Sequence, residues 1–250
     1  MIFVIRHGER ADQIDNRVES DIELIHDPPI TKLGHLQSYS AGIKIQSLVQ
    51  EGYKNGLLST PNPQYVFVSS PFIRCLQTAY HMIKSLDPKD IYKETIFYEE
   101  GIGELMAESL FTSHILDKLY IRHKTEEEVK KLIPYKIQEG FVKSDEHVIR
   151  PGYPENVGSG YERFDLCYKE IMSYFMRELN QDNDKVLVLV THAFGISAVA
   201  QIHELIFFTD KGTDYTTFHQ IFYDEKARGK GRFLLKLYSK HILDLIKPKL

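Results

Sequence analysis

Two short apolar runs, at residues 2–5 and 186–190, each lead directly into a polar segment that contains a histidine. The first run continues into Arg6 and His7, followed by a glycine, and the second continues through a threonine into His192. Continuous apolar, β-branched runs are typical of strands buried on both faces, and a glycine after such a strand lets the backbone turn. The chain therefore has two strands that each bring an imidazole to the end of a sheet.

Other runs of the same kind predict further strands, and the stretches between them have the spacing of amphipathic helices. The strands are expected at residues 2–5, 65–68, 95–98 and 186–190. The helices are expected at residues 31–51, 72–86, 126–139, 161–179 and 195–206. Strands that alternate with helices indicate an α/β fold, a three-layer α/β/α sandwich in which helices cover both faces of a mainly parallel central sheet.

The end of the chain has a different pattern. Residues 217–223 and 232–238 read as two strands joined by a Lys- and Gly-rich turn at 225–231, and they are expected to extend one edge of the sheet. No repeat or linker divides the chain, so residues 1–250 are interpreted as a single domain. Residues 111–150 are charge-rich and weakly patterned, and they are interpreted as an insertion over the active-site end of the sheet.

Composition excludes several classes of protein. The formal net charge is -4 over 250 residues, so no nucleic-acid partner is expected. No apolar run approaches the roughly 20 residues that span a bilayer, and no signal-like region precedes the first strand, so no membrane association is expected. The two cysteines, Cys75 and Cys167, are expected to be half-buried helix residues, and the low cysteine content indicates a cytoplasmic or nuclear location. These features do not define the oligomeric state.

Residues with useful chemistry follow each of the four predicted parallel strands. Arg6 and His7 follow the first strand, Arg74 comes soon after the second, Glu104 after the third and His192 after the fourth. In open parallel sheets ligands bind beyond the carboxyl ends of the strands, so these side chains are expected to converge. Three other carboxylates lie close to Glu104, namely Glu99, Glu100 and Glu108, and most of them are expected to be surface charges.

The segment after the second strand predicts an anion site. Ser70 suits the N-cap of the following helix and Pro71 its first position, which places Arg74 in the first turn. Free N–H groups and the helix dipole favour an anion there. Arg6, Arg10 and Arg74 together can hold a phosphoryl group, because guanidinium groups match its oxygens with paired hydrogen bonds.

A histidine among arginines indicates phosphoryl transfer. Neutral His7 would attack phosphorus in line, while the arginines would hold the oxygens and disfavour protonation of the ring. His192 would hydrogen-bond the transferring group, and Glu104 would protonate the leaving alkoxide and then activate the water that cleaves the phosphohistidine. Histidines such as His114 and His123 lack ligand spacing, and no nucleotide-binding glycine loop is present, so neither a metal nor a cofactor is expected.

These residues resemble the histidine phosphatase superfamily, which also contains the cofactor-dependent phosphoglycerate mutases. Within it the chain is most similar to the phosphatase domain of the suppressors of T-cell receptor signalling and to the ecdysteroid-phosphate phosphatases. The similarity covers the chain from Ile2 to about Val199. It is carried by the motifs Arg6 to Asp12, Asp27 to Thr31 with Gly34 and Gln37, Ser70-Pro71, Arg74-Cys75, Gln77 to Ala79 and Glu99 to Glu104.

The resemblance implies an α/β/α fold and metal-independent hydrolysis of phosphomonoesters through a phosphohistidine. It implies that His7 is the nucleophile, that Arg74 and Arg10 bind phosphate, that Glu104 is the proton donor and that His192 is the second histidine. The spacing of the motif that ends at Glu104 is the reason for choosing this carboxylate over its neighbours.

Two alternatives remain open. A catalytically weak phosphatase-like domain would serve as a binding or assembly module, because a fold does not determine a function. A phosphoglycerate mutase is disfavoured, since Glu9 and Arg10 stand where mutases usually have a Gln/Glu–Ser/Thr pair. Leu105 follows Glu104 where the subgroup usually has an aromatic, and the segment 111–150 is dissimilar. The expected substrate is therefore either a phosphorylated small molecule or a phosphoprotein, and the sequence does not distinguish the two.

Overall fold

A computed structural model describes residues 1–13, 27–140, 149–182, 184–203, 214–224 and 232–238. Within these residues a seven-stranded sheet has the order β4-β3-β2-β5-β1-β6-β7. Its strands are β1 (Ile2–Arg6), β2 (Gln64–Ser69), β3 (Ile91–Tyr98), β4 (Lys136–Glu139), β5 (Lys185–Thr191), β6 (Phe218–Asp224) and β7 (Arg232–Tyr238). β4, β3, β2, β5 and β1 run parallel, whereas β6 and β7 add an antiparallel pair at one edge. The mainly parallel sheet and its C-terminal extension are confirmed.

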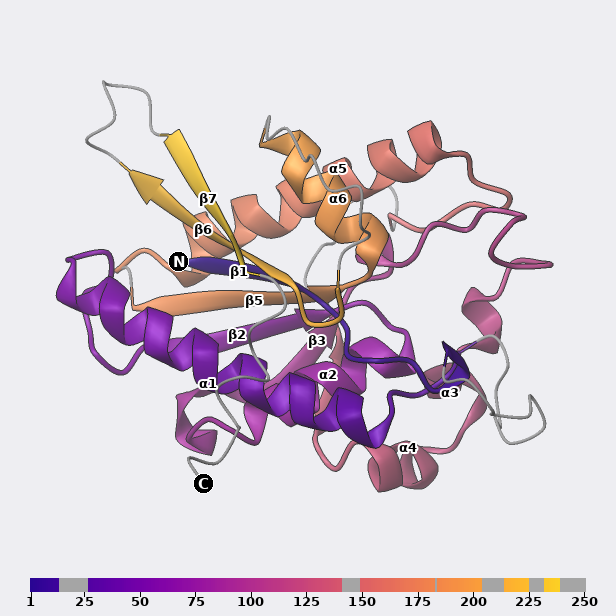
Figure 1. The fold of residues 1–250 in the computed structure, drawn as a ribbon, viewed down its shortest axis with the longest axis horizontal. Helices are drawn as coiled ribbons and strands as arrows, with labels where there is room; N and C mark the ends of the chain where they lie inside the picture. The colour runs from indigo at the N-terminus through magenta and orange to yellow at the C-terminus, as the bar shows by residue number, and fades with distance from the viewer. Residues whose placement is uncertain (14–26, 141–148, 183, 204–213, 225–231, 239–250) are drawn as a thin grey trace.

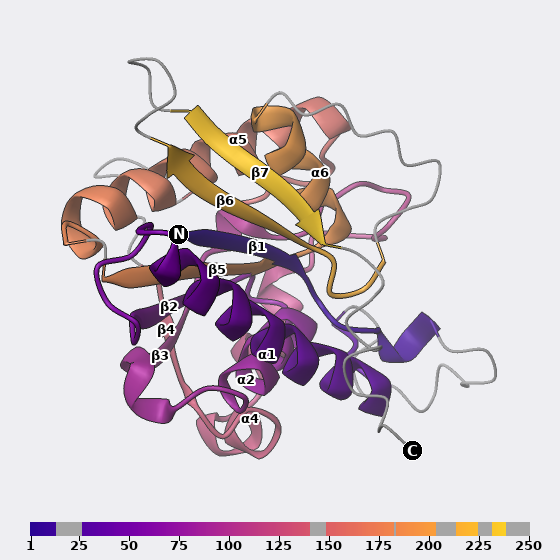
Figure 2. The same cartoon turned by 60° about the vertical axis from the view of Figure 1, so that its left-hand side comes forward.

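Helices cover both faces of this sheet (Figure 1). α1 (Lys32–Lys54) and α2 (Ile73–Ile83) lie on one face, and α5 (Val157–Tyr174) and α6 (Ala193–Ile202) lie on the other. Figure 2 shows the same separation from a second direction, with the sheet between the two helical layers. The three-layer α/β/α arrangement predicted from the sequence is therefore confirmed.

The first strand shows why its sequence is apolar at successive positions. Phe3 and Ile5 pack in the core cluster that includes residues of α1 and α2, whereas Ile2 and Val4 pack in the cluster that includes residues of α5 and α6. Successive side chains of a strand point to opposite faces, so a strand covered on both faces buries all of them.

The helix predicted at residues 126–139 is wrong in its second half. α4 (Glu126–Leu132) begins at a capping box on Thr125, and β4 (Lys136–Glu139) then pairs in parallel with β3. Pro134 separates the two elements, because the residue before a proline disfavours the helical conformation. The other short elements in the described parts of the chain are α3 (Tyr120–His123), the 3-10 segments Ala11–Gln13, Pro88–Asp90, Glu100–Ile102 and Leu116–Lys118, and the π-helix Phe175–Leu179.

Some of the sequence predictions fall outside the described residues. The turn at 225–231, the end of the helix predicted at 195–206 and part of the segment 111–150 lie there. The interpretation of the chain as one domain with an insertion at 111–150 stays a prediction. Among the helices that the structure describes, none has the length and apolar character needed to cross a bilayer.

The strand register places the carboxyl ends of the parallel strands at one edge. Arg6 at the end of β1 lies opposite Thr191 at the end of β5, while Ser69 at the end of β2 lies opposite Val190 and Tyr98. The residues that follow these strands therefore emerge close together, as expected for a ligand site in an open parallel sheet.

Candidate active site

His7 directly follows β1, and its backbone is held on two sides. The His7 N–H donates to the carbonyl oxygen of Thr191 (2.9 Å), and the Gly8 N–H donates to Thr78 Oγ1 (2.9 Å). Gly8 also packs against the backbone of Gly34 in α1, where a Cβ on Gly8 would lie 2.7 Å from the Gly34 carbonyl oxygen. The glycine after the histidine is therefore required by the close approach of α1.

A hydrogen bond of the His7 ring selects its tautomer. Nδ1 lies 2.8 Å from the Gly8 carbonyl oxygen, which can only accept, so Nδ1 carries the proton and Nε2 keeps its lone pair. Burial lowers the pKa of His7 well below the ordinary 6.5, and the positive charges of Arg74 and Arg6 lower it further. The sequence argument named the arginines, but burial is the larger cause. The result is a neutral imidazole with a nucleophilic nitrogen.

His192 follows β5 and has the opposite tautomer. Its ring centroid is 5.4 Å from that of His7. Arg74 Nη2 lies 3.1 Å from Nδ1 and can only donate, so Nδ1 accepts and Nε2–H donates to Ser70 Oγ at 2.8 Å. Burial is the main cause that lowers the pKa of His192 well below 6.5, followed by the charge of Arg74. The second histidine is therefore also neutral, but both of its ring nitrogens are engaged.

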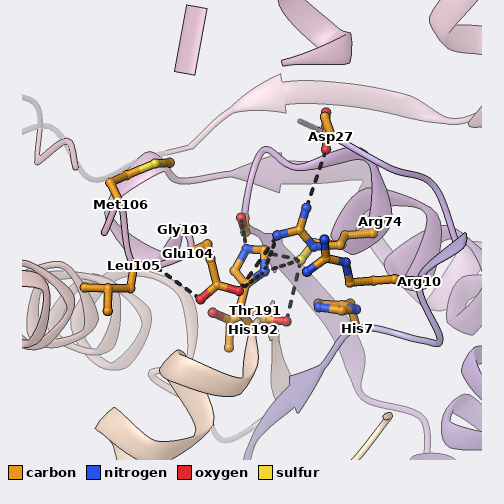
Figure 3. Close-up of polar contacts among 12 residues, drawn as sticks. His7, Arg10, Asp27, Arg74, Gly103, Glu104, Leu105, Met106, Thr191 and His192 are labelled. Atoms are coloured by element: carbon orange, nitrogen blue, oxygen red, sulfur yellow. Dashed lines mark hydrogen bonds and ion pairs between the residues drawn. The ribbon is translucent and has the colours of Figure 1, made fainter. Parts of the chain in front are cut away.

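Arg74 lies at the centre of the cluster in Figure 3 and is 1% exposed. Its Nη2 donates to His192, its Nη1 is 3.8 Å from Asp27 Oδ1, and its guanidinium carbon is 4.3 Å from the centroid of the Phe72 ring. Its Nε and Nη1 are buried and have no hydrogen-bond partner within the described residues. Buried guanidinium nitrogens of this kind are donors available to an anion.

Asp27 is a buried carboxylate to which the sequence analysis gave no role in the site. Its Oδ1 accepts from the N–H of Ile73 (2.9 Å), and its Oδ2 accepts from the N–H of Tyr120 (2.9 Å). Desolvation raises the pKa of Asp27 to about 6, although Arg74 and the two N–H groups act in the opposite direction. The carboxylate joins the starts of α2 and α3 beside Arg74, so it positions the helix that carries this arginine.

The predicted N-cap of α2 is wrong by two residues. Phe72 is the N-cap, and Ile73 is the first helical residue. The hydroxyl of Ser70 accepts from His192 instead of capping the helix, because this tertiary contact competes with the local one. Arg74 still lies in the first turn, as predicted.

Arg6 and Arg10 complete the predicted set of arginines. The guanidinium carbon of Arg6 is 4.3 Å from the centroid of the Tyr215 ring, which is itself 5.8 Å from the centroid of the His7 ring. Arg10 donates to Asp12 through Nε (3.0 Å) and Nη2 (2.5 Å), and Figure 3 shows its guanidinium in the central cluster. Tyr215 was not predicted as a site residue, because its segment carries no motif.

Glu104 approaches the cluster from the loop after β3. Its Oε2 lies 3.4 Å from His192 Nδ1 and 3.8 Å from Arg74 Nη2, and its Oε1 accepts from the N–H of Leu105 at 3.1 Å. Its side chain is 13% exposed, whereas His192 and Arg74 are buried. The carboxylate is therefore more accessible than these two partners.

Most of the carboxylates near Glu104 were predicted to be surface charges. This prediction is wrong for Glu99 and Glu100. They are 8% and 4% exposed, and Glu100 forms ion pairs with Arg122 and, at 2.8 Å, with Arg150. Glu108 is exposed, as predicted. The partners of Glu100 come from distant segments, so only the tertiary structure could reveal its burial.

The two cysteines are buried more deeply than predicted. Cys75 in α2 is 0% exposed and Cys167 in α5 is 1% exposed, and both are free thiols. In the part of the chain that the structure describes, no group of three or more His, Cys, Asp or Glu side chains is arranged to hold a metal ion.

Several solved structures share this fold. An ecdysone phosphate phosphatase from Bombyx mori, in complex with tungstate, is 19% identical, with a TM-score of 0.52, and the match covers 96% of this chain and 92% of that one. A mycobacterial glucosyl-3-phosphoglycerate phosphatase in complex with VO3 is 15% identical, with a TM-score of 0.53 and coverage of 95% and 98%. A mutant phosphoserine phosphatase from Entamoeba histolytica, in complex with phosphoserine, is 15% identical, with a TM-score of 0.53 and coverage of 97% and 98%.

No protein-family model matches the chain, and no curated protein matches it significantly in sequence. At these identities the structural matches establish the fold. It is the α/β fold that this chain shares with the three phosphatases.

Proposed function

We propose that this protein is a phosphomonoester hydrolase that acts through a phosphohistidine on His7 and needs no metal. The observation that carries the proposal is the pairing of His7 with Arg74. A neutral His7 keeps the lone pair of Nε2. It lies in the same buried cluster as the Arg74 guanidinium, of which two nitrogens have no hydrogen-bond partner among the described residues. A nucleophile beside such donors suits a phosphoryl group, whose oxygens carry the charge that guanidinium stabilises.

In the first step, His7 Nε2 attacks phosphorus and the ester P–O bond breaks. Arg74, Arg6 and Arg10 hold the phosphoryl oxygens, which favours the in-line geometry. Glu104 delivers a proton to the departing oxygen, so the alcohol leaves in its neutral form.

In the second step, Glu104 takes a proton from water, which attacks phosphorus and breaks the P–N bond. Inorganic phosphate leaves, and His7 returns to its neutral form. His192 accepts from Arg74 through Nδ1 in the free protein. The negative charge of a bound ester raises the pKa of this ring, which takes up one proton from solvent. Nδ1–H then donates to a phosphoryl oxygen, and the Arg74 donor that it replaces turns to the same phosphoryl group.

The neighbouring structures support the reaction class. Tungstate and VO3 are oxyanions that resemble a phosphoryl group, and the first two neighbours hold one of them each, while the third holds phosphoserine. The three proteins are named for different phosphate esters. The substrate class that we propose for this chain is therefore phosphomonoesters in general, either of a small molecule or of a phosphoprotein.

The test is hydrolysis of p-nitrophenyl phosphate in excess EDTA by the wild type and by His7→Ala. We expect EDTA-resistant turnover that disappears in the variant, and a wild-type phosphoenzyme that is labile to acid and stable to base, as a P–N bond is. Turnover that survives His7→Ala would refute the nucleophile, and sensitivity to EDTA would refute metal independence. A folded wild type that binds vanadate without turnover would favour a binding module.

A further inference from the structure

A buried ion pair lies behind the loop that carries Glu104. Arg163 in α5 donates to Glu155 through Nε (2.7 Å to Oε1) and Nη2 (2.9 Å to Oε2). The two side chains are 5% and 4% exposed. A bidentate pair of this kind has a well-defined geometry, because both planar groups are held by two parallel hydrogen bonds.

The other contacts of this pair reach the backbone on both sides of Glu104. We call residues 101–106 the acid loop. Arg163 Nη1 donates to the carbonyl oxygen of Gly101 (2.7 Å), and Arg163 Nη2 donates to that of Glu104 (3.1 Å). Glu155 accepts from the N–H of Met106 through Oε2 (2.9 Å), and its own N–H donates to the Met106 carbonyl oxygen (2.8 Å). The pair thus holds the acid loop at its start, its middle and its end.

Close packing of the acid loop on α5 supports the same arrangement independently. A Cβ on Gly101 would lie 2.5 Å from Cys167 Sγ, and a Cβ on Gly160 would lie 2.4 Å from Leu105 Cδ1. Glycine at these two positions lets the loop and the helix approach to contact distance. The location of the acid loop is therefore set by α5.

A buried ion pair is by itself weak evidence for a role in stability, since apolar residues of similar volume often replace one without loss. An apolar pair cannot donate to two backbone carbonyls and accept from a backbone N–H. The Glu104 side chain is partly exposed, and within the described residues the hydrogen bond that its carboxylate accepts comes from the next residue's N–H, that of Leu105. Its placement therefore depends on the backbone that Arg163 and Glu155 hold.

We infer that Arg163 and Glu155 are positioning residues for the proton donor Glu104, an inference that rests on the proposed function. Neither residue touches the reacting atoms. They keep the Glu104 carboxyl within reach of the leaving-group oxygen, so their loss affects the step that needs a proton. A misplacement of about 1 Å can cost about 100-fold in such a step.

The test compares Arg163→Lys with the matched control Arg177→Lys. Arg177 is exposed in the π-helix that follows α5, and it donates to the Ser173 carbonyl oxygen of α5 (3.4 Å). The readout is kcat/KM for p-nitrophenyl phosphate and for glycerol 2-phosphate, because kcat/KM includes cleavage of the ester but not hydrolysis of the phosphoenzyme. We expect Arg163→Lys to lower the value for the alkyl ester at least about tenfold and for the aryl ester less than about threefold, since a good leaving group needs little protonation.

A second comparison separates positioning from a general loss of structure. In a Glu104→Gln background, Arg163→Lys is expected to produce no further loss on the alkyl ester, because the group that it positions is already inactive. The double variant Arg163→Met/Glu155→Leu keeps the buried volume and is expected to fold, yet to show the same selective loss. Equal losses on both esters, or a full additional loss in the Glu104→Gln background, would overturn the inference.

Amide hydrogen exchange tests the inference without turnover. We expect Arg163→Lys, but not Arg177→Lys, to lower the protection of the acid loop, above all at Met106, whose N–H donates to Glu155. If the wild type shows no turnover, the proposed function fails, and unchanged protection would then overturn the positioning role as well. If the wild type turns over and neither readout changes in Arg163→Lys, only the positioning role fails.

Discussion

The carboxyl ends of β1 and β5 are two regions that look equivalent in the sequence and differ in the structure. Each presents a buried histidine whose pKa lies well below 6.5. After β1, His7 donates through Nδ1 to the Gly8 carbonyl oxygen and keeps the lone pair of Nε2. After β5, His192 accepts through Nδ1 from Arg74 and donates through Nε2 to Ser70.

The difference shows that the group facing Nδ1 decides what each ring can do. A carbonyl oxygen can only accept and a guanidinium can only donate, so they impose opposite tautomers on the same residue type. His7 is left with a lone pair that can attack phosphorus. In His192 both ring nitrogens are engaged, so this ring has no free lone pair with which to attack phosphorus.

The largest expected effect tests which histidine is the nucleophile. His7→Ala is expected to lower turnover of p-nitrophenyl phosphate by on the order of 10⁴-fold or more, since removal of a nucleophile disables the whole covalent pathway. The measurement is steady-state turnover together with trapping of the phosphoenzyme after rapid denaturation. If a phosphohistidine were still trapped in His7→Ala, His192 would be the nucleophile instead of His7.

His192→Ala is expected to have a smaller effect, a loss of about 10²- to 10³-fold in kcat, which is typical for a group that stabilises a transition state by hydrogen bonding. The phosphoenzyme should still form, only more slowly. Stopped-flow or quenched-flow measurement of its formation distinguishes the two variants. Complete absence of phosphoenzyme in folded His192→Ala would show that the two rings act as one unit.

Asp27 lies beside Arg74, and Arg74 in turn donates to His192. The pH dependence of protein stability therefore tests the surroundings of His192. Desolvation raises the pKa of Asp27 from 3.8 to about 6, so the folded protein binds this proton more tightly than the unfolded chain. The contribution of Asp27 to the free energy of unfolding is therefore fully present below pH 3.8 and is lost as pH rises through about 6. The whole contribution of Asp27 to the free energy of unfolding is about 3 kcal/mol, because each unit of difference between its folded and unfolded pKa contributes about 1.4 kcal/mol.

Asp27→Asn is expected to remove this dependence, as measured by urea unfolding at several pH values between 4 and 7. The control is Asp165→Asn, which changes a carboxylate of α5 that is paired with Lys169. A pH dependence in Asp27→Asn equal to that of the wild type would contradict the assignment of the proton to Asp27.

The smallest expected effect concerns the side of the site where Tyr215 stacks on Arg6. Tyr215→Ala is expected to raise KM about two- to fivefold with little change in kcat, because a cation–π contact contributes about 0.5–1 kcal/mol. Tyr215→Phe keeps the ring over Arg6 and loses only the hydroxyl that donates to Gln13, so its KM should stay near the wild-type value. The measurement is steady-state kinetics on p-nitrophenyl phosphate. If Tyr215→Ala lowered kcat by a larger factor than it raised KM, Tyr215 would instead take part in the chemistry around His7.

Much of the fold could be predicted because strand and helix patterns are local properties of the chain. The error at residues 126–139 came from reading helical spacing past Pro134, in a segment whose short edge strand has little apolar character. The error at Ser70 had another origin. Its local sequence suits a helix N-cap, but its hydroxyl accepts from His192, which is far away in the sequence.

The candidate site shows the same division. The histidines and arginines that follow the strands could be predicted from residue type and topology. Asp27 and Tyr215 could not, because their roles depend on contacts between distant segments, such as Asp27 with Tyr120 and Tyr215 with Arg6. The burial of Glu100 was missed for the same reason.

The sequence by itself determined the alternation of strands and helices, and it determined which residue types stand at the carboxyl ends of the strands. Only the tertiary structure decided which nitrogen of His7 and of His192 carries the proton, and that burial is the main cause that keeps both rings neutral. The physical reason is that a tautomer depends on the hydrogen-bond partner of the ring, and a pKa depends on burial and on nearby charge. The partner of His7 is the carbonyl of the next residue, but the partner Arg74 of His192 and the layers that bury both rings come from distant segments, which only folding brings together.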